Sequence, residues 1–442
     1  MTESQQSDTK HSQTGAQATR RHVLQTVAGV GVGALLGVGQ VGASTTSGGE
    51  ELWRFETGDI VRSSPTVADG TLFVGSFDHN VYALDVATGD EQWRFETGAA
   101  VNSSPTVVDS TVFVGSTDDN VYTLDAETGD EQWHFETGDE NWFSSTSGSV
   151  FSSPTAVDGT VFVGSSDNHV YALDAESGDE QWHFETGHNV ISSPTVVDRT
   201  VFVGSTDNHV YAIDAATGDE QWHFETGDSV FSSPTVVDGT VFLGSTDDHV
   251  YALDAETGDE QWRFETGSGV SSSPTVVDDT LFVGSYDDHV YALDTETGDE
   301  HWQFETGLGG KSSPTVVDDT VFIGSDDRNV YALDAETGEK HWQFETGNYI
   351  WSSPTVVDGT VFIGSDSGNV YALDAGVKGS SECSRTSLGT LGHHGELATA
   401  DEEIDVEAAV DEQLPGFGAG AALAGIGATG YLLKRRLNDT DH

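Results

Sequence analysis

The chain has 442 residues, and its 75 acidic residues against 16 basic ones give a formal net charge of −59. Such a charge repels nucleic acid and anionic lipid, so we expect neither as a direct partner of the folded chain. A single cysteine, Cys383, excludes an intrachain disulfide and leaves no plausible Cys-based zinc or iron–sulfur site. The acidic residues are spread evenly among aromatic and β-branched residues, which indicates a folded protein and not a long acidic tail.

The first predicted element is an export signal at residues 1–43. Arg20 and Arg21 precede a Gly-rich, mildly apolar stretch that ends at Ala43. This pattern resembles a twin-arginine signal cleaved after Ala43, with Val23 at a position where that family prefers Phe. An N-terminal membrane anchor is the alternative.

The twin-arginine resemblance implies a protein that folds before export, which suits folding in concentrated salt. The acidic composition also resembles that of proteins from salt-in halophiles. At molar salt the Debye length is about 3 Å, which screens most of the self-repulsion of such a chain. In dilute buffer we expect the same charge to destabilise the fold.

One pattern recurs from Glu51 to Ala375 with a period of 40 residues. Each unit contains four short runs rich in β-branched and aromatic residues, separated by Asp, Gly and Thr turns. In the first unit these runs span 63–67, 71–75, 81–84 and 92–95. Such units are typical of a four-stranded antiparallel meander. Several runs are apolar on both faces, which a strand requires when neighbouring sheets cover both of its sides.

We therefore predict an all-β fold over residues 51–375, an eight-bladed β-propeller of four-stranded antiparallel blades. Small Ser-Ser-Pro-Thr runs suit the crowded axis, and one Trp per repeat fills the wider gaps farther out. The last unit lacks its Trp, while an outer-type strand at residues 52–56 has no inner strands before it. Pairing of this N-terminal strand with residues 353–374 would complete the last blade and close the ring.

A turn motif supports this fold by resemblance. The segment from Ala83 through Asp85, Thr88 and Gly89 to Trp93 has the pattern A-x-D-x-x-T-G-x-x-x-W, which returns in most units. It resembles the tryptophan-docking motif of propellers of the pyrroloquinoline-quinone (PQQ) repeat type. The resemblance implies a turn that joins the third strand to the outermost strand, and the repetition makes it specific.

Quinoprotein dehydrogenases share this repeat, and the resemblance sets out what such an enzyme adds. The additions are long insertions, a vicinal cysteine pair against the quinone, and a Ca²⁺ site with a catalytic Asp. None of them is visible in this sequence, so we expect no enzyme activity and no cofactor. A PQQ-dependent, quinoprotein-like oxidoreductase that uses PQQ and Ca²⁺ is the alternative.

The connections that vary among the units are predicted to lie on one face. They run from the outermost strand to the next innermost strand, and from the second strand to the third. The residue before each Ser-Ser-Pro-Thr run varies freely, and we expect these side chains to surround an axial funnel. With one residue of a nine-residue insertion, the predicted binding residues are Arg62, Asn102, Trp142, Phe151, Ile191, Phe231, Ser271, Lys311 and Trp351.

The composition of this face indicates the chemistry of its ligand. Phe143 of the insertion and the hairpin residues Phe77 and Tyr286 are expected on the same face. Aromatic and cationic groups together favour a ligand with apolar and anionic parts, or a protein loop. The alternative is that these residues bind nothing and vary because their loops contact only water.

A second ring holds His or Asn at the start of each third strand. Equivalent atoms on adjacent blades lie about 10 Å apart, whereas ligands of one ion lie within about 2 to 2.6 Å of it. One metal ion cannot gather this ring, so we expect local hydrogen bonds and no metal site. The many Ser, His and Asp residues are repeated positions without an isolated triad, so we predict no catalytic residues.

The C-terminal region divides into two predicted parts. Residues 376–413 form an acidic linker, and residues 414–442 contain Pro-Gly-Phe, an uncharged stretch and a basic cluster at 434–436. A span of about 17 residues just crosses a bilayer, and the trailing cations place that end in the cytoplasm. The tail resembles the archaeosortase sorting tail of haloarchaeal surface proteins, which implies removal of the tail and attachment of a lipid. A plain transmembrane anchor is the alternative.

These inferences combine into one functional hypothesis. The chain is predicted to be a non-catalytic, monomeric binding or scaffold propeller, exported by the twin-arginine pathway and tethered to the extracellular face of the cell membrane. Its architecture is similar to the propeller lipoprotein of the bacterial outer-membrane assembly machinery, whose function a single-membrane cell would not need. The partner, an unknown protein or a small anionic and apolar ligand, would bind at the funnel.

Overall fold

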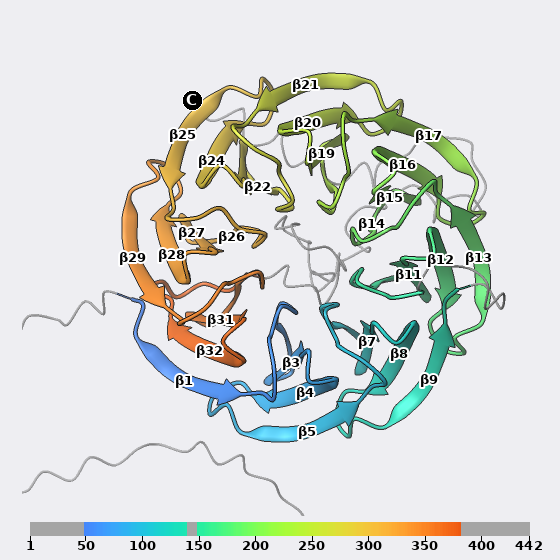
Figure 1. Cartoon of the computed structure of the whole chain (residues 1–442), viewed down its shortest axis with the longest axis horizontal. Helices are drawn as coiled ribbons and strands as arrows, with labels where there is room; N and C mark the ends of the chain where they lie inside the picture. The colour runs from blue at the N-terminus through green and yellow to red at the C-terminus, as the bar shows by residue number, and fades with distance from the viewer. Residues whose placement is uncertain (1–47, 139–147, 382–442) are drawn as a thin grey trace, which may run out of the picture. The chain divides into compact units, whose positions relative to one another are not determined.

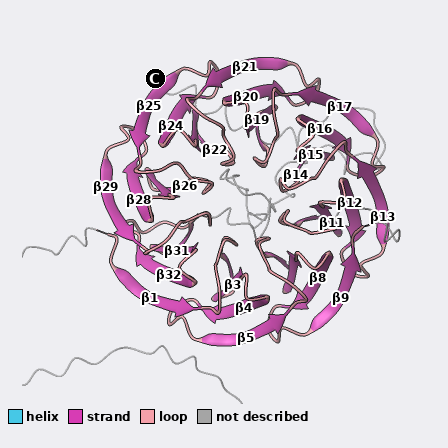
Figure 2. Ribbon diagram, in the orientation of Figure 1, coloured by secondary structure: helices cyan, strands magenta, loops and turns pink. Residues whose placement is uncertain are grey.

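The computed structural model describes residues 48–138 and 148–381, which lie within one compact unit. Within them, the β-strands form eight four-stranded antiparallel sheets, arranged as the blades of a ring (Figure 1). Figure 2 shows strands and loops throughout this part of the chain, and none of it forms a helix long and apolar enough to cross a membrane. The predicted all-β, eight-bladed propeller is therefore confirmed. The predicted signal, Cys383 and the sorting tail lie outside the described residues.

Each blade runs outward from the axis through four strands, and blades are numbered by their innermost strands. The innermost strands are short: β2 (Thr66–Ala68), β6 (Thr106–Val108), β10 (Thr155–Val157), β14 (Thr195–Val197), β18 (Thr235–Val237), β22 (Thr275–Val277), β26 (Thr315–Val317) and β30 (Thr355–Val357). The second strands are β3 (Thr71–Gly75), β7 (Thr111–Gly115), β11 (Thr160–Gly164), β15 (Thr200–Gly204), β19 (Thr240–Ser245), β23 (Thr280–Gly284), β27 (Thr320–Gly324) and β31 (Thr360–Ser365).

The two outer strands of each blade are longer than the innermost one. The third strands are β4 (Asn80–Asp85), β8 (Asn120–Asp125), β12 (His169–Asp174), β16 (His209–Asp214), β20 (His249–Asp254), β24 (His289–Asp294), β28 (Asn329–Asp334) and β32 (Asn369–Asp374). The outermost strands are β5 (Glu91–Glu96), β9 (Glu131–Glu136), β13 (Glu180–Glu185), β17 (Glu220–Glu225), β21 (Glu260–Glu265), β25 (Glu300–Glu305), β29 (Lys340–Glu345) and β1 (Glu51–Glu56).

The ring closes as the sequence predicts, because β1 completes blade 8. The sheet order of this blade is β1-β32-β31-β30, and β1 and β32 lie side by side in Figure 1. In the antiparallel register, Trp53 lies opposite Ala372 and Glu56 opposite Asn369. Two backbone hydrogen bonds extend this ladder, from Gly49 N to Asp374 O and from Asp374 N to Glu50 O. The pairing leaves neither strand with an open edge inside the blade.

The innermost strands begin later than predicted, at Thr66 in place of Ser63 in blade 1. The physical reason is that the Ser-Ser-Pro segments bond to the neighbouring blade. Ser64 N donates to Ser104 Oγ, and the same bond recurs around the ring until Ser353 N donates to Ser64 Oγ, at distances of 2.8–3.0 Å. Each innermost Thr hydroxyl also donates to the next blade's Pro carbonyl. This closed ring of buried hydrogen bonds ties all eight blades together at the axis.

Farther out, one Trp from each outermost strand packs against the turn of the following blade. Trp53 Nε1 donates to Val86 O at 3.0 Å, and Trp222 Nε1 to Ala255 O at 3.0 Å. A Cβ on Gly89 would lie 2.6 Å from Trp53 Cε3, so the turn needs glycine for contact as well as for its φ of +74°. The predicted filling of the gaps between blades by Trp is confirmed, and the hydrophobic clusters accordingly join pairs of adjacent blades.

A carboxylate latch connects neighbouring blades at the outer rim. In blade 1, Asp78 Oδ2 accepts from Tyr82 Oη and from Gly58 N, which follows β1, both at 2.6 Å. Burial opposes ionisation, but hydrogen bonds from Tyr82, Gly58 and Asn80 hold the pKa of Asp78 below its ordinary value. Blade 8 is the exception, because Ser367 replaces the Asp and Tyr371 Oη donates instead to Thr346 O at 2.7 Å.

The first residues of the predicted linker stay on the propeller. Ser381 N donates to Val356 O at 2.7 Å, and Ser381 Oγ accepts from Val356 N at 3.1 Å. Val377 packs against the hydrophobic cluster that joins blades 7 and 8. Residues 377–381 therefore cover the innermost strand of blade 8.

Candidate functional site

The two sets of variable connections lie together on one face, which we call the variable face. Phe77 N, in the β3–β4 hairpin, donates to Ile60 O at 2.9 Å, in the segment that enters blade 1. The same contact recurs in blade 2, from Thr117 N to Ala100 O at 2.9 Å. Hairpin and connection thus meet side by side in each of these blades, as the meander predicts.

The residues before the Ser-Ser-Pro-Thr runs, which we call the funnel residues, follow a fixed alternation. The residue just before them is buried in every blade except blade 7, where it is Gly310, and the Ser just after them is buried in all eight. Among the funnel residues, Phe231 and Lys311 are exposed, and the others are half-buried: Arg62, Asn102, Phe151, Ile191, Ser271 and Trp351. Trp142 and Phe143 lie outside the described residues.

Three of the predicted binding residues come together in one cluster, although they belong to blades 1, 7 and 8. The Arg62 guanidinium lies 3.6 Å from the centroid of the Trp351 ring, and Lys311 Nζ lies 4.1 Å from it. Arg62 also lies 5.2 Å from the Phe77 ring centroid. Cations this close to aromatic rings are stabilised by the ring quadrupole, by about 0.5–2 kcal/mol each.

Two aspartates complete what we call the seam cluster: Arg62, Phe77, Lys311, Asp326, Trp351 and Asp366. Arg62 makes a bidentate ion pair with Asp366, with Nε–Oδ1 and Nη2–Oδ2 distances of 3.0 and 2.9 Å. Trp351 Nε1 donates to Asp326 Oδ1 at 2.8 Å. Both aspartates stand in β-hairpins between second and third strands, at the position that Phe77 and Tyr286 occupy in blades 1 and 6.

The charges of the seam cluster perturb one another. Lys311 is exposed overall, yet partial removal of water from its ammonium, followed by repulsion from Arg62, lowers the pKa of Lys311. Burial and then the charge of Asp366 raise the pKa of Asp326, against the hydrogen bond from Trp351. Arg62 is already neutralised by Asp366, so Lys311 is the cation of this cluster with the most access to a ligand.

The other predicted residues are not gathered in this way. Asn102, Phe151, Ile191 and Phe231 lie on four successive blades. Ser271 is hydrogen-bonded to Tyr286, whose pKa is raised by burial. The sequence therefore predicted the position of these residues on the blades, but their common role in binding stays a prediction.

Exposed apolar side chains are concentrated on the variable face. Four large hydrophobic residues of the described chain are exposed, and three of them, Phe231, Leu308 and Tyr349, lie in connections from an outermost to an innermost strand. Leu308 and Tyr349 precede Lys311 and Trp351 by only a few residues, so they flank the seam cluster. Sequence reasoning missed these two residues and both aspartates, although all four occupy positions that differ from their counterparts in other repeats.

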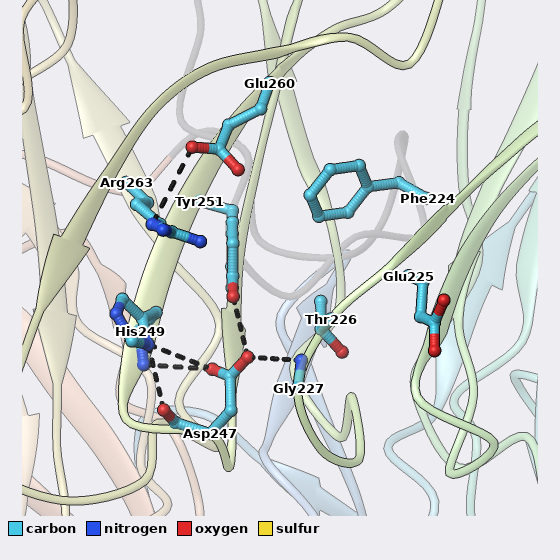
Figure 3. Close-up of a pocket in the computed structure, with 9 residues that line it drawn as sticks. All are labelled: Phe224, Glu225, Thr226, Gly227, Asp247, His249, Tyr251, Glu260 and Arg263. Atoms are coloured by element: carbon cyan, nitrogen blue, oxygen red, sulfur yellow. Dashed lines mark hydrogen bonds and ion pairs between the residues drawn. The ribbon is translucent and has the colours of Figure 1, made fainter.

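A groove of about 490 Å³ lies on the outer rim between blades 4 and 5 (Figure 3). It contains the repeated latch: Asp247 Oδ2 accepts from Tyr251 Oη at 2.7 Å and from Gly227 N at 2.6 Å. His249 Nδ1 lies 2.9 Å from Asp247 O. The ring of His and Asn residues thus makes local turn contacts, as expected, at Asn80, Asn120, His169, His209, His249, His289, Asn329 and Asn369.

No group of three or more His, Cys, Asp or Glu side chains in residues 48–138 and 148–381 is placed to hold a metal ion together. The seam cluster does contain an aromatic ring and cations that a planar anionic quinone would require. The Trp351 ring is, however, already covered by Arg62, and Asp326 and Asp366 compete for the cations. As they stand, these residues do not fit a bound quinone.

The fold and this face define a class of protein: an eight-bladed β-propeller with one variable face that carries aromatic, apolar and charged side chains. Within this class, the chain belongs to the family described as outer membrane protein assembly factor BamB, which is built from PQQ-type repeats. The family matches residues 37–141, 134–197, 185–275 and 247–382. A comparison with curated proteins gave no match.

Solved structures with the same fold include a BamB protein and two dehydrogenases. BamB from Moraxella catarrhalis is 21% identical, with a TM-score of 0.63 over 73% of this chain and 97% of that chain. Quinohemoprotein alcohol dehydrogenase from Comamonas testosteroni is 17% identical, with a TM-score of 0.61 over 77% and 78%. A europium-containing methanol dehydrogenase is 15% identical, with a TM-score of 0.63 over 74% and 93%. At these identities the likeness concerns the fold alone.

Proposed function

We propose that this protein is a non-catalytic binding or scaffold propeller that engages its partner with the variable face around the axis. The observation that carries the proposal is the distribution of exposed apolar side chains. Three of the four large ones in the described residues lie on this face, on a chain with a net charge of −59. Exposed Phe, Leu and Tyr side chains on so acidic a surface are favoured when a partner covers them.

The sector of blades 7, 8 and 1 supports a particular ligand chemistry. Leu308 and Tyr349 are exposed by 48% and 42%, and they flank the ammonium of Lys311. A ligand or protein loop with an acidic group beside apolar atoms would pair with Lys311 and cover these side chains. Because the acidic surroundings repel an anion, the attraction of Lys311 alone would hold a purely anionic ligand weakly, and contacts with the exposed apolar side chains would have to add to it.

The location that we propose is the cell surface. The twin-arginine-like segment at 1–43 supports export, and the tail at 414–442 supports a membrane tether of either lipid or protein type. Membership in a family described as an outer membrane protein assembly factor supports a place at a membrane. Within this proposal the propeller is a monomer, and it binds neither nucleic acid nor a cofactor.

Substitution on the variable face tests the proposal. Lys311→Ala and Tyr349→Ala, separately and together, are compared with the unmodified protein in pull-down from surface extracts at molar salt. Lys340→Ala is the matched control, because Lys340 begins β29 at the opposite end of an outermost strand. We expect the first two variants to lose partners that the control retains. Unchanged partners in the double variant would defeat the proposal.

The alternative is a PQQ-dependent oxidoreductase, which the fold shared with alcohol dehydrogenases supports. Addition of PQQ and Ca²⁺ separates the two functions. A shift in quinone absorbance together with dye-linked oxidation of an alcohol or sugar would replace the binding proposal. A propeller without enzyme activity gives neither signal.

A further inference from the structure

Blades 3 and 4 differ from the other blades in carrying a histidine at both of two diagonally adjacent positions on the outer rim. One position begins the third strand, and the other is the fourth residue of the outermost strand. From blade 1 to blade 8 the pairs are Asn80/Arg94, Asn120/His134, His169/His183, His209/His223, His249/Arg263, His289/Gln303, Asn329/Gln343 and Asn369/Arg54. Figure 3 shows the corresponding place in blade 5, where Arg263 stands beside His249.

The two histidines of each pair lie close together on the same side of their hairpin. In blade 3, the ring centroids of His169 and His183 are 5.2 Å apart, with an interplanar angle of 86°. In blade 4, those of His209 and His223 are 5.3 Å apart, with an angle of 75°. Two ring nitrogens that share a metal ion at about 2.0–2.1 Å lie roughly 3.4 Å apart, which puts the ring centroids about 5 Å apart, close to the spacing in both pairs.

In blade 3, the Nδ1 atoms of the pair are engaged by acidic residues or backbone. His169 Nδ1 lies 3.1 Å from Asp167 O, and His183 Nδ1 lies 2.8 Å from Glu180 Oε1. In the neutral rings these contacts favour the proton on Nδ1 and leave Nε2 with its lone pair. The hydrogen bond to Asp167 raises the pKa of His169, so protons compete with a metal ion at that ring. Histidines that bind metal ions in proteins are oriented in this way, by a carboxylate or carbonyl at the other ring nitrogen.

Blade 4 repeats the arrangement with the same partners. His209 Nδ1 lies 3.0 Å from Asp207 O, and His223 Nδ1 lies 2.8 Å from Glu220 Oε1. No described residue is hydrogen-bonded to Nε2 of any of these four histidines. The side chains of His183 and His223 are half exposed, at 53% and 51%, so an ion from solution has access to them.

We propose that each pair binds one divalent cation of the borderline class, Zn²⁺, Ni²⁺ or Cu²⁺, through its two Nε2 atoms, with water in the other coordination positions. Imidazole nitrogen suits these ions, whereas Ca²⁺ and Mg²⁺ prefer oxygen. With two protein ligands, the sites exchange their ions with solution. In blade 3, Glu185 lies opposite His169 across the ladder and adds negative charge beside the site. The inference does not depend on the proposed function.

Calorimetric titration of the full chain with Ni²⁺ tests this inference, at pH 7.5 and in molar salt so that unspecific attraction to the acidic surface is screened. His183→Ala and His223→Ala should each remove one bound ion, and the double variant should remove two. Histidines outside the two pairs contribute equally to all samples, so the difference counts the paired sites. An excess of Ca²⁺ should not compete.

The chain offers its own controls in the blades with one histidine. His134→Ala in blade 2 and His289→Ala in blade 6 should leave the number of bound ions unchanged. Asn120→His should add one ion, because it completes the pair with His134, whose Nδ1 already lies 2.7 Å from Glu131 Oε1. The proposal is overturned if the double variant binds as many ions as the unmodified protein. It is overturned as well if the single-histidine controls lose as many ions as the paired variants, or if Asn120→His gains none.

Discussion

Blade 8 and blades 1 to 7 have the same four-stranded sheet, but they are held together in different ways. In blades 1 to 7 a single stretch of chain supplies all four strands, and a tight Asp-to-Gly turn joins the third strand to the outermost strand. In blade 8 the outermost strand, β1, comes from the other end of the propeller sequence. The comparison shows that side-chain and backbone contacts must replace the missing turn.

Several contacts make that replacement. Gly49 and Glu50 extend the ladder with Asp374, and Arg62, in the connection from β1 to β2, pairs with Asp366 of blade 8. The bidentate pair joins residues 304 positions apart in the chain. The predicted funnel residue Arg62 therefore stabilises closure of the ring in addition to any part in binding, and experiments on it must separate the two.

The largest expected effect follows from removal of the closing strand. Deletion of residues 48–57 leaves the outer edge of β32 unpaired in blade 8 and removes Trp53 from the following blade. We expect loss of the cooperative unfolding transition of the whole propeller, measured by circular dichroism in molar salt. Leu52→Ala, at a side chain that is 54% exposed, is the control that should unfold as the unmodified protein does. A deletion variant with an unchanged transition would show that blade 8 does not need β1.

The docked tryptophans allow blade 8 to be compared with a continuous blade. Trp222 in blade 4 is only 8% exposed, and Trp222→Ala should lower the free energy of unfolding by about 3–5 kcal/mol. Trp53 in blade 8 is less buried, so Trp53→Ala should cost less in denaturant unfolding. An equal or larger cost for Trp53→Ala would mean that the closing strand depends on this contact more than the continuous blades do.

Loss of the Arg62–Asp366 pair should have an intermediate effect. Arg62→Met leaves the Asp366 carboxylate, whose side chain is 5% exposed, without its partner. We expect a loss of about 2–3 kcal/mol in the free energy of unfolding, because an unpaired buried charge costs more than a pair contributes. Adding Asp366→Asn should restore part of it. If the double variant is no more stable than Arg62→Met, the unpaired Asp366 carboxylate does not cause the loss of stability.

The smallest expected effect concerns pH and the latch that blade 8 lacks. Burial opposes ionisation of Asp327, but hydrogen bonds from Tyr331, Asn329 and Gly307 lower its pKa below 3.8. Because the pKa of Asp327 is lower in the folded protein than in the unfolded chain, its ionised carboxylate stabilises the fold above pH 3.8. This contribution is lost as the pH falls through the lowered pKa. Asp327→Asn should therefore reduce the stability lost between pH 7 and pH 2, by under about 1 kcal/mol because the group is partly solvated.

Unfolding in molar salt at both pH values gives this difference, with Asp130→Asn as control. Asp130 is an exposed turn aspartate, so its replacement should leave the pH dependence as it is. An identical loss of stability in Asp327→Asn and the unmodified protein would remove the latch as a source of acid sensitivity.

Much of the fold could be predicted from the sequence because the same strand pattern recurs in eight repeats. The spacing of Trp and Pro fixes the number of blades, and the unpaired run at 52–56 can complete only the unit that lacks its Trp. The innermost strands were predicted too long, because the bonds of Ser64 pass to the next blade and not to its own sheet. Whether Ser64 bonds within its own sheet or to the next blade depends on the distance between blades, and the repeat pattern gives no information on that distance.

The sequence by itself determined that this chain forms a closed ring of similar blades and which positions vary on one face, because burial patterns and repeat spacing are local properties. Only the tertiary structure decided that Arg62, Lys311 and Trp351 meet two aspartates, while the other funnel residues stay apart. The physical reason is that curvature of the ring places the hairpin of one blade beside the connection that enters the next. Which of these side chains then touch depends on distances and rotamers across blades. For the paired histidines of blades 3 and 4 it depends on the distances between the two outer strands of one blade.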